Sequence, residues 1–147
     1  MMFKTAALIL VLAFSSQAIA GVEVVDAWMR AMPPGQPTAA AYMTLKNTSP
    51  GTLGITAVSS PQARAVEIHE SRQVDGSWRM RRLPRLELLA GATLHLEPGG
   101  IHLMLFGLRQ SPQAGEQFEF TLTLADGETV SVMASVLAAG STGHHQH

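Results

Sequence analysis

Short runs in which apolar and polar residues alternate fill most of the chain after residue 20, and clusters of glycine or proline separate most of them. Alternation with a period of two is typical of half-buried β-strands, whereas an amphipathic helix would show a 3.6-residue period. Closely spaced strands with turn signals between them predict an all-β domain, an antiparallel β-sandwich. Nine runs qualify: 22–31, 39–47, 53–60, 64–73, 77–83, 92–97, 101–108, 117–125 and 129–136.

The first 20 residues have a different character. Lys4 precedes a nine-residue apolar run, "AALILVLAF", and small residues stand at both ends of Ala18-Ile19-Ala20. This pattern predicts a secretory signal peptide cleaved after Ala20, because a membrane-spanning helix needs about 20 apolar residues. We therefore expect an exported protein without a membrane span after cleavage, divided into a signal peptide (1–20), one β-sandwich domain (21–137) and a flexible His-rich tail (138–147).

The composition excludes several classes of function. Without cysteine, the chain has no thiolate nucleophile and no Cys ligand for a blue-copper site. It also lacks the GxSxG and HExxH motifs of common hydrolases, so we do not expect an enzyme. Residues 21–147 carry a net charge of −2, which argues against a nucleic-acid binder. The one basic cluster (Arg79, Arg81, Arg82 and Arg85) is short, and we interpret it as a solvated strand edge or face.

A hairpin signal, Asp75-Gly76, brings a histidine and a methionine together. If these two residues form the turn, Val74 faces Ser77, Ser71 faces Met80 and His69 faces Arg82. Side chains two apart on a strand share a face, as do direct partners. His69 and Met80 are then diagonal neighbours, about 7–8 Å apart at Cα and within reach of long side chains.

A second histidine and methionine lie in "GGIHLMLFGL". Ile101, Leu103 and Leu105 alternate as a core-facing set, which turns His102 and Met104 to the other, outer face. If this strand lies near the hairpin, two imidazoles and two thioethers can converge. Soft thioethers combined with imidazoles favour Cu(I) over Mg, Ca or Mn, and zinc rarely takes methionine.

A plainer interpretation must be weighed against this one. Methionine is often core filler, and a single histidine is more often a hydrogen-bonded polar residue than a ligand. The alternative is therefore a metal-free structural or adhesive sandwich, in which exposed Met80 and Met104 would have no explanation. His95, which alternates with two leucines, is expected on the surface.

The spacing of the four residues resembles the signature of the periplasmic copper chaperone PCu(A)C family: His69, ten residues, Met80, twenty-one residues, His102, one residue, Met104. "AWMRAMPPGQPTAAAYMTLKN" and "PGGIHLMLFGL" add to the resemblance, which covers about residues 22–136. It implies a Greek-key, cupredoxin-like sandwich in the periplasm. It also implies that this sandwich binds Cu(I) through these four residues and passes copper to a cytochrome c oxidase copper-site subunit or another chaperone. Many members have methionine after the first histidine, where this chain has Glu70 on the opposite strand face.

The C-terminal tail offers a second, separate group of imidazoles. His144, His145 and His147 form a short His-rich tract, and such tracts can bind metal. Nitrogen ligands on a flexible segment suit Cu(II) better than Cu(I). We therefore expect a secondary Cu(II) site there, with an inert solvated tail as the alternative.

Overall fold

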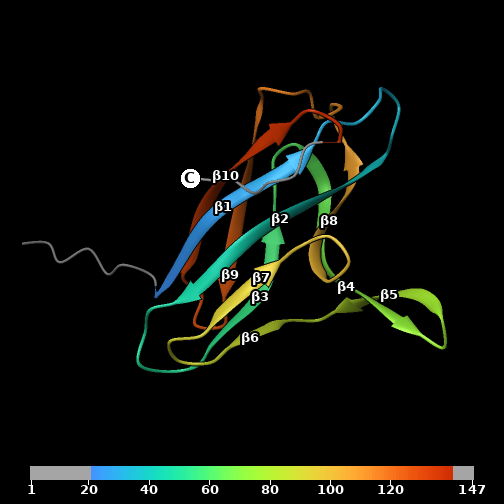
Figure 1. Cartoon of the computed structure of the whole chain (residues 1–147). Helices are drawn as coiled ribbons and strands as arrows, with labels where there is room; N and C mark the ends of the chain where they lie inside the picture. The colour runs from blue at the N-terminus through green and yellow to red at the C-terminus, as the bar shows by residue number, and fades with distance from the viewer. Residues whose placement is uncertain (1–20, 141–147) are drawn as a thin grey trace, which may run out of the picture.

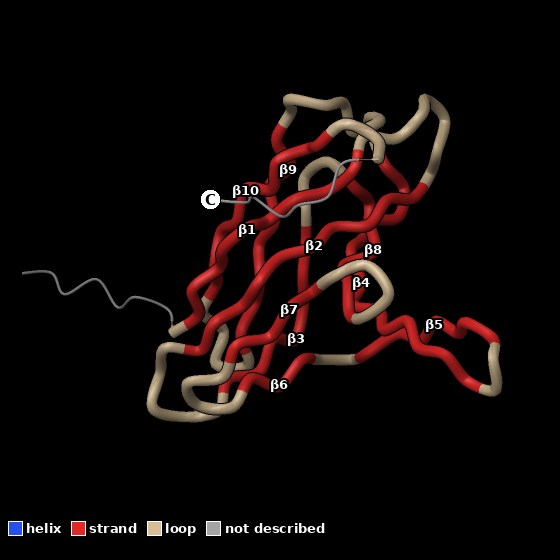
Figure 2. The backbone as a smooth tube through the Cα atoms, viewed as in Figure 1, coloured by secondary structure: helices blue, strands red, loops and turns tan. Residues whose placement is uncertain are grey.

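A computed structural model describes residues 21–140, which form ten β-strands and no helix (Figures 1 and 2). The predicted signal peptide and the histidines of the tail lie outside the described residues. Within 21–140 there is no helix with the length and hydrophobicity needed to cross a membrane. The strands are β1 (Val22–Arg30), β2 (Thr38–Asn47), β3 (Leu53–Ser59), β4 (Ala63–Val74), β5 (Ser77–Leu83), β6 (Leu86–Leu88), β7 (Thr93–Leu96), β8 (Ile101–Leu108), β9 (Gln117–Leu124) and β10 (Thr129–Leu137).

The strands form one sheet that closes on itself. Seven of them follow one another in the order β4-β8-β2-β1-β10-β9-β3, and the pairing of Val58 with Val66 joins β3 back to β4. Strands β5, β6 and β7 are additions that pair with β4, β3 and β2. Every pair is antiparallel except β1 with β10. The predicted all-β sandwich is confirmed, and Figure 1 shows β5 extending beyond the body.

The barrel interior is filled mainly by alternate residues of the seven strands that close the sheet, as the alternation predicts, whereas β5 is exposed except for Leu83. On β8, Leu103 and Leu105 are buried in the core, and Ile101 packs against it partly buried. On β4, Ile68 lies in the core and pairs with Leu103. Since neighbouring residues point to opposite faces, this packing fixes His69 and His102 on the outer side of the same two strands.

A β-bulge interrupts β1, which the sequence pattern presents as one regular strand. The register with β2 shifts between Val25 and Trp28, and Asp26 has a φ of 52°, in the left-handed region that disfavours most side chains. After the bulge, Met29 points into the core and Trp28 pairs with Tyr42. The bulge therefore places Trp28 on the outer face that carries the two histidines.

Strand β6 was missed by the sequence prediction because it has three residues and follows Pro84. The end of β6 is anchored by the buried side chain of Asn47 at the end of β2. The Nδ2 group of Asn47 donates hydrogen bonds to the carbonyls of Leu88 and Leu89. Its Oδ1 accepts hydrogen bonds from the backbone N–H and the hydroxyl of Ser49. One asparagine thus joins two loops that alternation alone could not bring together.

Candidate metal centre

Four residues that the sequence predicts as ligands share the outer face of three neighbouring strands, β5, β4 and β8. His69 on β4 lies directly opposite His102 on β8, and Met104 lies opposite Glu67. Met80 on β5 lies opposite Ser71, in the predicted hairpin register. Each of the other three is therefore either directly across from His69 or one diagonal step away, within reach of long side chains. We call His69, Met80, His102 and Met104 the His/Met set.

The members of the set differ in exposure. The imidazole centres of His69 and His102 are 6.1 Å apart, and the ring of Tyr42 is 6.4 Å from that of His102. His102 lies on the predicted outer strand face but is only 4% exposed. Met104 is half-buried, whereas Met80 is 53% exposed. The set therefore runs from a buried imidazole to an exposed thioether.

A backbone carbonyl fixes the tautomer of His102. Nδ1 of His102 lies 3.1 Å from the carbonyl oxygen of Gly100. A carbonyl can only accept, so Nδ1 carries the hydrogen and donates it. In the neutral ring Nε2 then keeps its lone pair, which is the form of imidazole that binds metal. This is the support that metal-bound histidines usually receive from their surroundings.

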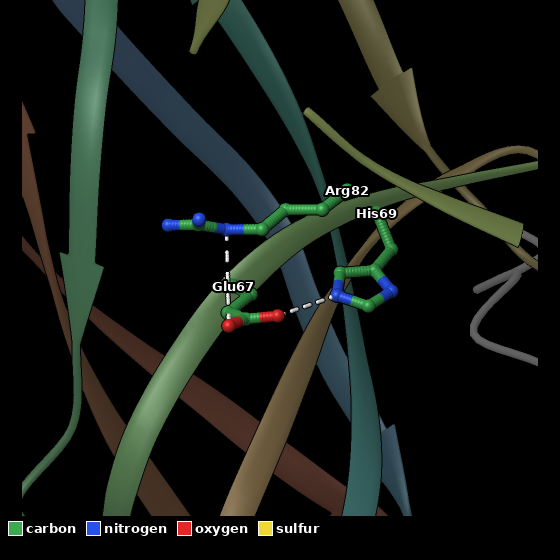
Figure 3. A network of polar contacts seen from close by, with 3 residues as sticks. All are labelled: Glu67, His69 and Arg82. Atoms are coloured by element: carbon green, nitrogen blue, oxygen red, sulfur yellow. Dashed lines mark hydrogen bonds and ion pairs between the residues drawn. The ribbon is translucent and has the colours of Figure 1, made fainter. Parts of the chain in front are cut away.

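A carboxylate fixes the opposite tautomer of His69. Nε2 of His69 lies 2.8 Å from Oε2 of Glu67, and the other ring nitrogen lies on the side away from Glu67 (Figure 3). The hydrogen bond from His69, aided by the charge of Arg82, holds the pKa of Glu67 below its ordinary value. An ionised carboxylate only accepts, so Nε2 donates, and in the neutral ring Nδ1 keeps the lone pair. That Nδ1 is buried and has no hydrogen-bond partner among the described residues.

The chemistry of the set follows from these two tautomers. Each histidine keeps a nitrogen lone pair, and each shares its strand face with a thioether. A buried nitrogen without a partner is costly unless something binds it. Within residues 21–140, His, Cys, Asp and Glu side chains form no group of three that could hold a metal. The donors beside the imidazoles are sulfur atoms, and a donor set of imidazole and thioether suits a soft ion.

Aromatic rings continue from the His/Met set across the outer face. Phe106 lies 5.8 Å from His69, and Tyr42 lies 4.7 Å from Trp28, measured between ring centres. Burial raises the pKa of Tyr42, and the positive charge of Arg30 acts in the opposite direction. An open surface pocket of about 240 Å³ beside Tyr42 is also lined by Met104. A small group can therefore approach the set at this thioether.

Sequence reasoning missed the residues that orient the histidines. Glu67 and Gly100 each stand two positions before a histidine, and this spacing places a side chain on the same strand face. "EIH" was therefore a usable signal for Glu67, whereas the Gly100 carbonyl depends on the turn before β8. Glu70 points to the opposite face, as predicted, and there it forms an ion pair with Arg81. His95 is exposed, also as predicted, and contacts the hydroxyl of Thr44.

Solved structures with the same fold define the class of the domain. The copper-bound PCuAC domain from PmoF2 is 23% identical, with a TM-score of 0.68 over 83% of this chain and 97% of that chain. Cu(I)-bound DR1885 from Deinococcus radiodurans is 32% identical, with a TM-score of 0.63 over 83% of this chain and 81% of that one. The chain therefore has the cupredoxin-like fold of a PCuAC domain, which confirms the predicted fold class.

Sequence comparison then gives the family. The chain belongs to the LpqE-like family, described as "Putative lipoprotein LpqE-like", whose model matches residues 22–136. A relative from Leifsonia xyli subsp. xyli, "Putative lipoprotein Lxx21020", is 37% identical over 117 residues, which are 79% of this chain and 69% of the relative. A family of this description is consistent with export from the cytoplasm.

Proposed function

We propose that this protein is a periplasmic copper carrier that binds one Cu(I) ion through His69, Met80, His102 and Met104. The observation that carries the proposal is the pair of facing histidines with opposite tautomers. One lone pair belongs to a buried nitrogen that has no partner among the described residues. The two thioethers on the same strand face complete a set that favours Cu(I).

The solved relatives support copper as the cargo. PCuAC-domain structures include a copper-bound one and a Cu(I)-bound one. By family resemblance, the carrier delivers its ion to the copper-site subunit of cytochrome c oxidase or to another chaperone. A copper-buffering or resistance protein would use the same set without a dedicated acceptor. A carrier needs only to hold and release the ion, so we propose no catalytic residues.

A second copper site is proposed for the tail. His144, His145 and His147 supply nitrogen donors, and nitrogen and oxygen ligands in a tetragonal array suit Cu(II). The protein would then hold the two oxidation states at separate places. The tail site is independent of the His/Met set, so each can be lost without the other.

One titration series tests both sites. Competition titrations with Cu(I) and Cu(II) are performed on residues 21–147 and on a form that ends at Ala139. We expect one Cu(I) per molecule in both forms, and loss of most Cu(II) binding in the shorter one. Absence of stoichiometric Cu(I) binding would favour the metal-free alternative. Unchanged Cu(II) binding after truncation would show that the tail is not a metal site.

Replacing Glu67 with glutamine tests how the carboxylate contributes to copper affinity. Glutamine keeps the size of the side chain but removes the charge that orders the Nε2–H of His69. Loss of such a supporting partner typically lowers metal affinity about 10- to 100-fold, and we expect a decrease near the lower end for Cu(I). Glu70→Gln is the matched control, because Glu70 lies on the opposite face of the same strand. Equal effects of both substitutions would contradict a specific role for Glu67.

A further inference from the structure

The tip of the β4–β5 hairpin, residues 71–83, projects from the barrel (Figures 1 and 2). Among the ten described strands, β5 is an edge strand that pairs with β4 alone, and most of its residues are exposed. The proposed copper ligand Met80 lies in the middle of this strand. The hairpin is therefore the part of the His/Met set that another molecule can reach most easily.

The hairpin tip differs in charge from the rest of the protein. Residues 71–83 contain four arginines and one aspartate, for a net charge of +3. The remainder of the chain holds six cationic and ten anionic residues, for a net charge of −4. Arg81 and Arg82 are paired with Glu70 and Glu67, so the positive charge of the tip that is not offset within the described residues lies at Arg72 and Arg79. Clustered charge of one sign on a projecting element attracts the opposite sign.

Two of these arginines are placed at a cost to the hairpin. Arg72 lies directly opposite Arg79, and like charges in that position destabilise an antiparallel pair. No hydrogen bond or ion pair joins either side chain to another residue in the part of the chain that the structure describes. Arg81, by contrast, pairs with Glu70 at 2.7 Å. The repulsion between Arg72 and Arg79 would be relieved by an acidic group from outside.

The other face of the hairpin carries two exposed apolar side chains beside polar ones. Trp78 is 65% exposed, and Met80 shares its face two residues further along β5. The indole of Trp78 extends to within 3.9 Å of the position that a Cβ on Gly99 would take, beside the turn before β8. Exposed tryptophan, methionine and arginine are the residues enriched at protein interfaces, and tryptophan and arginine dominate their hot spots.

Protection of an edge strand is the simpler explanation for the arginines, because charged side chains prevent edge-to-edge aggregation. It accounts for charge on β5. It does not account for an exposed tryptophan on the same strand. Because the tip is a ribbon of two strands, a partner that encloses it can meet arginines on one face and tryptophan and methionine on the other.

We propose that the tip of the hairpin docks on an acidic surface of the protein that exchanges copper with this chain. Arg72 and Arg79 attract and orient that surface from one face of the hairpin, and Trp78 packs against it from the other. Met80, on the face of Trp78, lies at the interface where a second set of soft ligands can approach the ion. The proposal rests on the proposed function, because it concerns the partner of the same copper site.

The test measures copper transfer to two synthetic acceptors of opposite charge. Both peptides carry the same methionine-rich copper-binding segment, flanked by glutamates in one and by lysines in the other. The Cu(I)-loaded chain, residues 21–147, is mixed with each at low salt and at about 0.5 M salt, where the Debye length falls below 8 Å. We expect transfer to the acidic peptide to be about tenfold faster at low salt, within the range of electrostatic steering, and nearly equal rates at high salt.

Charge reversal identifies the surface. Arg72→Glu/Arg79→Glu should abolish or reverse the preference for the acidic peptide. Arg64→Glu/Arg109→Glu, with the same change in net charge at exposed positions outside the hairpin tip, should largely preserve it. Equal rates for both peptides, or equal effects of both double variants, would overturn the docking surface while leaving copper binding intact. No Cu(I) binding by the unmodified chain would overturn the proposed function and this partner with it.

A lipid surface is the competing occupant, because tryptophan and arginine also suit membrane interfaces. Cosedimentation with vesicles of phosphatidylglycerol and phosphatidylcholine tests whether the hairpin binds an anionic membrane. We expect no more than weak binding, with the same dependence on salt for both double variants. Strong binding that disappears only in Arg72→Glu/Arg79→Glu, together with equal transfer rates to the two peptides, would assign the hairpin to an anionic membrane and overturn the protein partner.

Discussion

Replacing His69 or His102 with alanine is expected to lower the Cu(I) affinity of the protein by more than about 100-fold. Loss of a residue that merely supports a metal ligand typically costs 10- to 100-fold, and removal of the ligand itself should cost more. The two histidines face each other across β4 and β8, and each has one nitrogen held by a hydrogen bond so that the other keeps its lone pair. A competition titration against a Cu(I) chelator measures the change.

The methionines of the set should show smaller effects that depend on sulfur. Methionine and leucine have similar volumes, so Met→Leu removes the donor with little change in packing. We expect Met80→Leu and Met104→Leu each to lower the affinity at least about tenfold. Met133→Leu is the matched control, because Met133 is also exposed but lies on β10.

His95 provides the control for the histidines. It is exposed on β7 and contacts Thr44, outside the His/Met set. His95→Ala should leave Cu(I) affinity unchanged. An effect of His95→Ala or Met133→Leu as large as that of the proposed ligands would show that copper binds by general surface chelation. That outcome would remove the basis for a defined centre.

The placement of Met80 beside His69 could be predicted from the sequence, because a two-residue turn determines the pairing register of β4 and β5. Asp75 and Gly76 both have positive φ, with values of 50° and 78°, as a two-residue hairpin of type I′ requires. Every step that follows is a count of residues along β4 and β5, and the predicted pairing of Ser71 with Met80 is confirmed. The same alternation correctly placed Glu70 on the opposite face from His69.

The long-range part of the centre could not be predicted in this way. Alternation gives the face of His102 but not the neighbour of β8, and His69 and His102 are brought together by two strands far apart in the sequence. The burial of His102 also depends on a distant strand, because Tyr42 on β2 lies against its ring. The bulge at Asp26 shifts the register of β1 in a way that its polar–apolar pattern does not reveal.

The contrast between the buried His102 and the exposed Met80 bears on how the centre would work. A buried imidazole with a fixed tautomer is preorganised, so little ordering is needed when an ion arrives. An exposed thioether on a projecting hairpin can leave that ion without disturbing the barrel. The set thus combines donors suited to retention with a donor suited to exchange, which is the combination that a carrier requires.

The same arrangement predicts how the ligands and their neighbours contribute to folding. Leu103 is 1% exposed and packs inside the barrel, so Leu103→Ala should destabilise the metal-free protein by about 2–5 kcal/mol through lost burial and the resulting cavity. Met104, the next residue, is half-buried on the outer face. Its replacement by alanine should cost less than about 2 kcal/mol, below the range for fully buried methionine.

His102→Ala should fall between these two, because the ring is buried but belongs to a polar site in which Nδ1 of His69 has no hydrogen-bond partner among residues 21–140. Urea unfolding of the metal-free variants measures the order, and the slope of unfolding free energy against urea should be unchanged if the native fold is kept. If Met104→Ala were as destabilising as Leu103→Ala, Met104 would act as a packing residue of the fold. Its presence beside His102 would then no longer indicate a metal ligand. The other ligands of the two histidines' copper site would have to be identified anew.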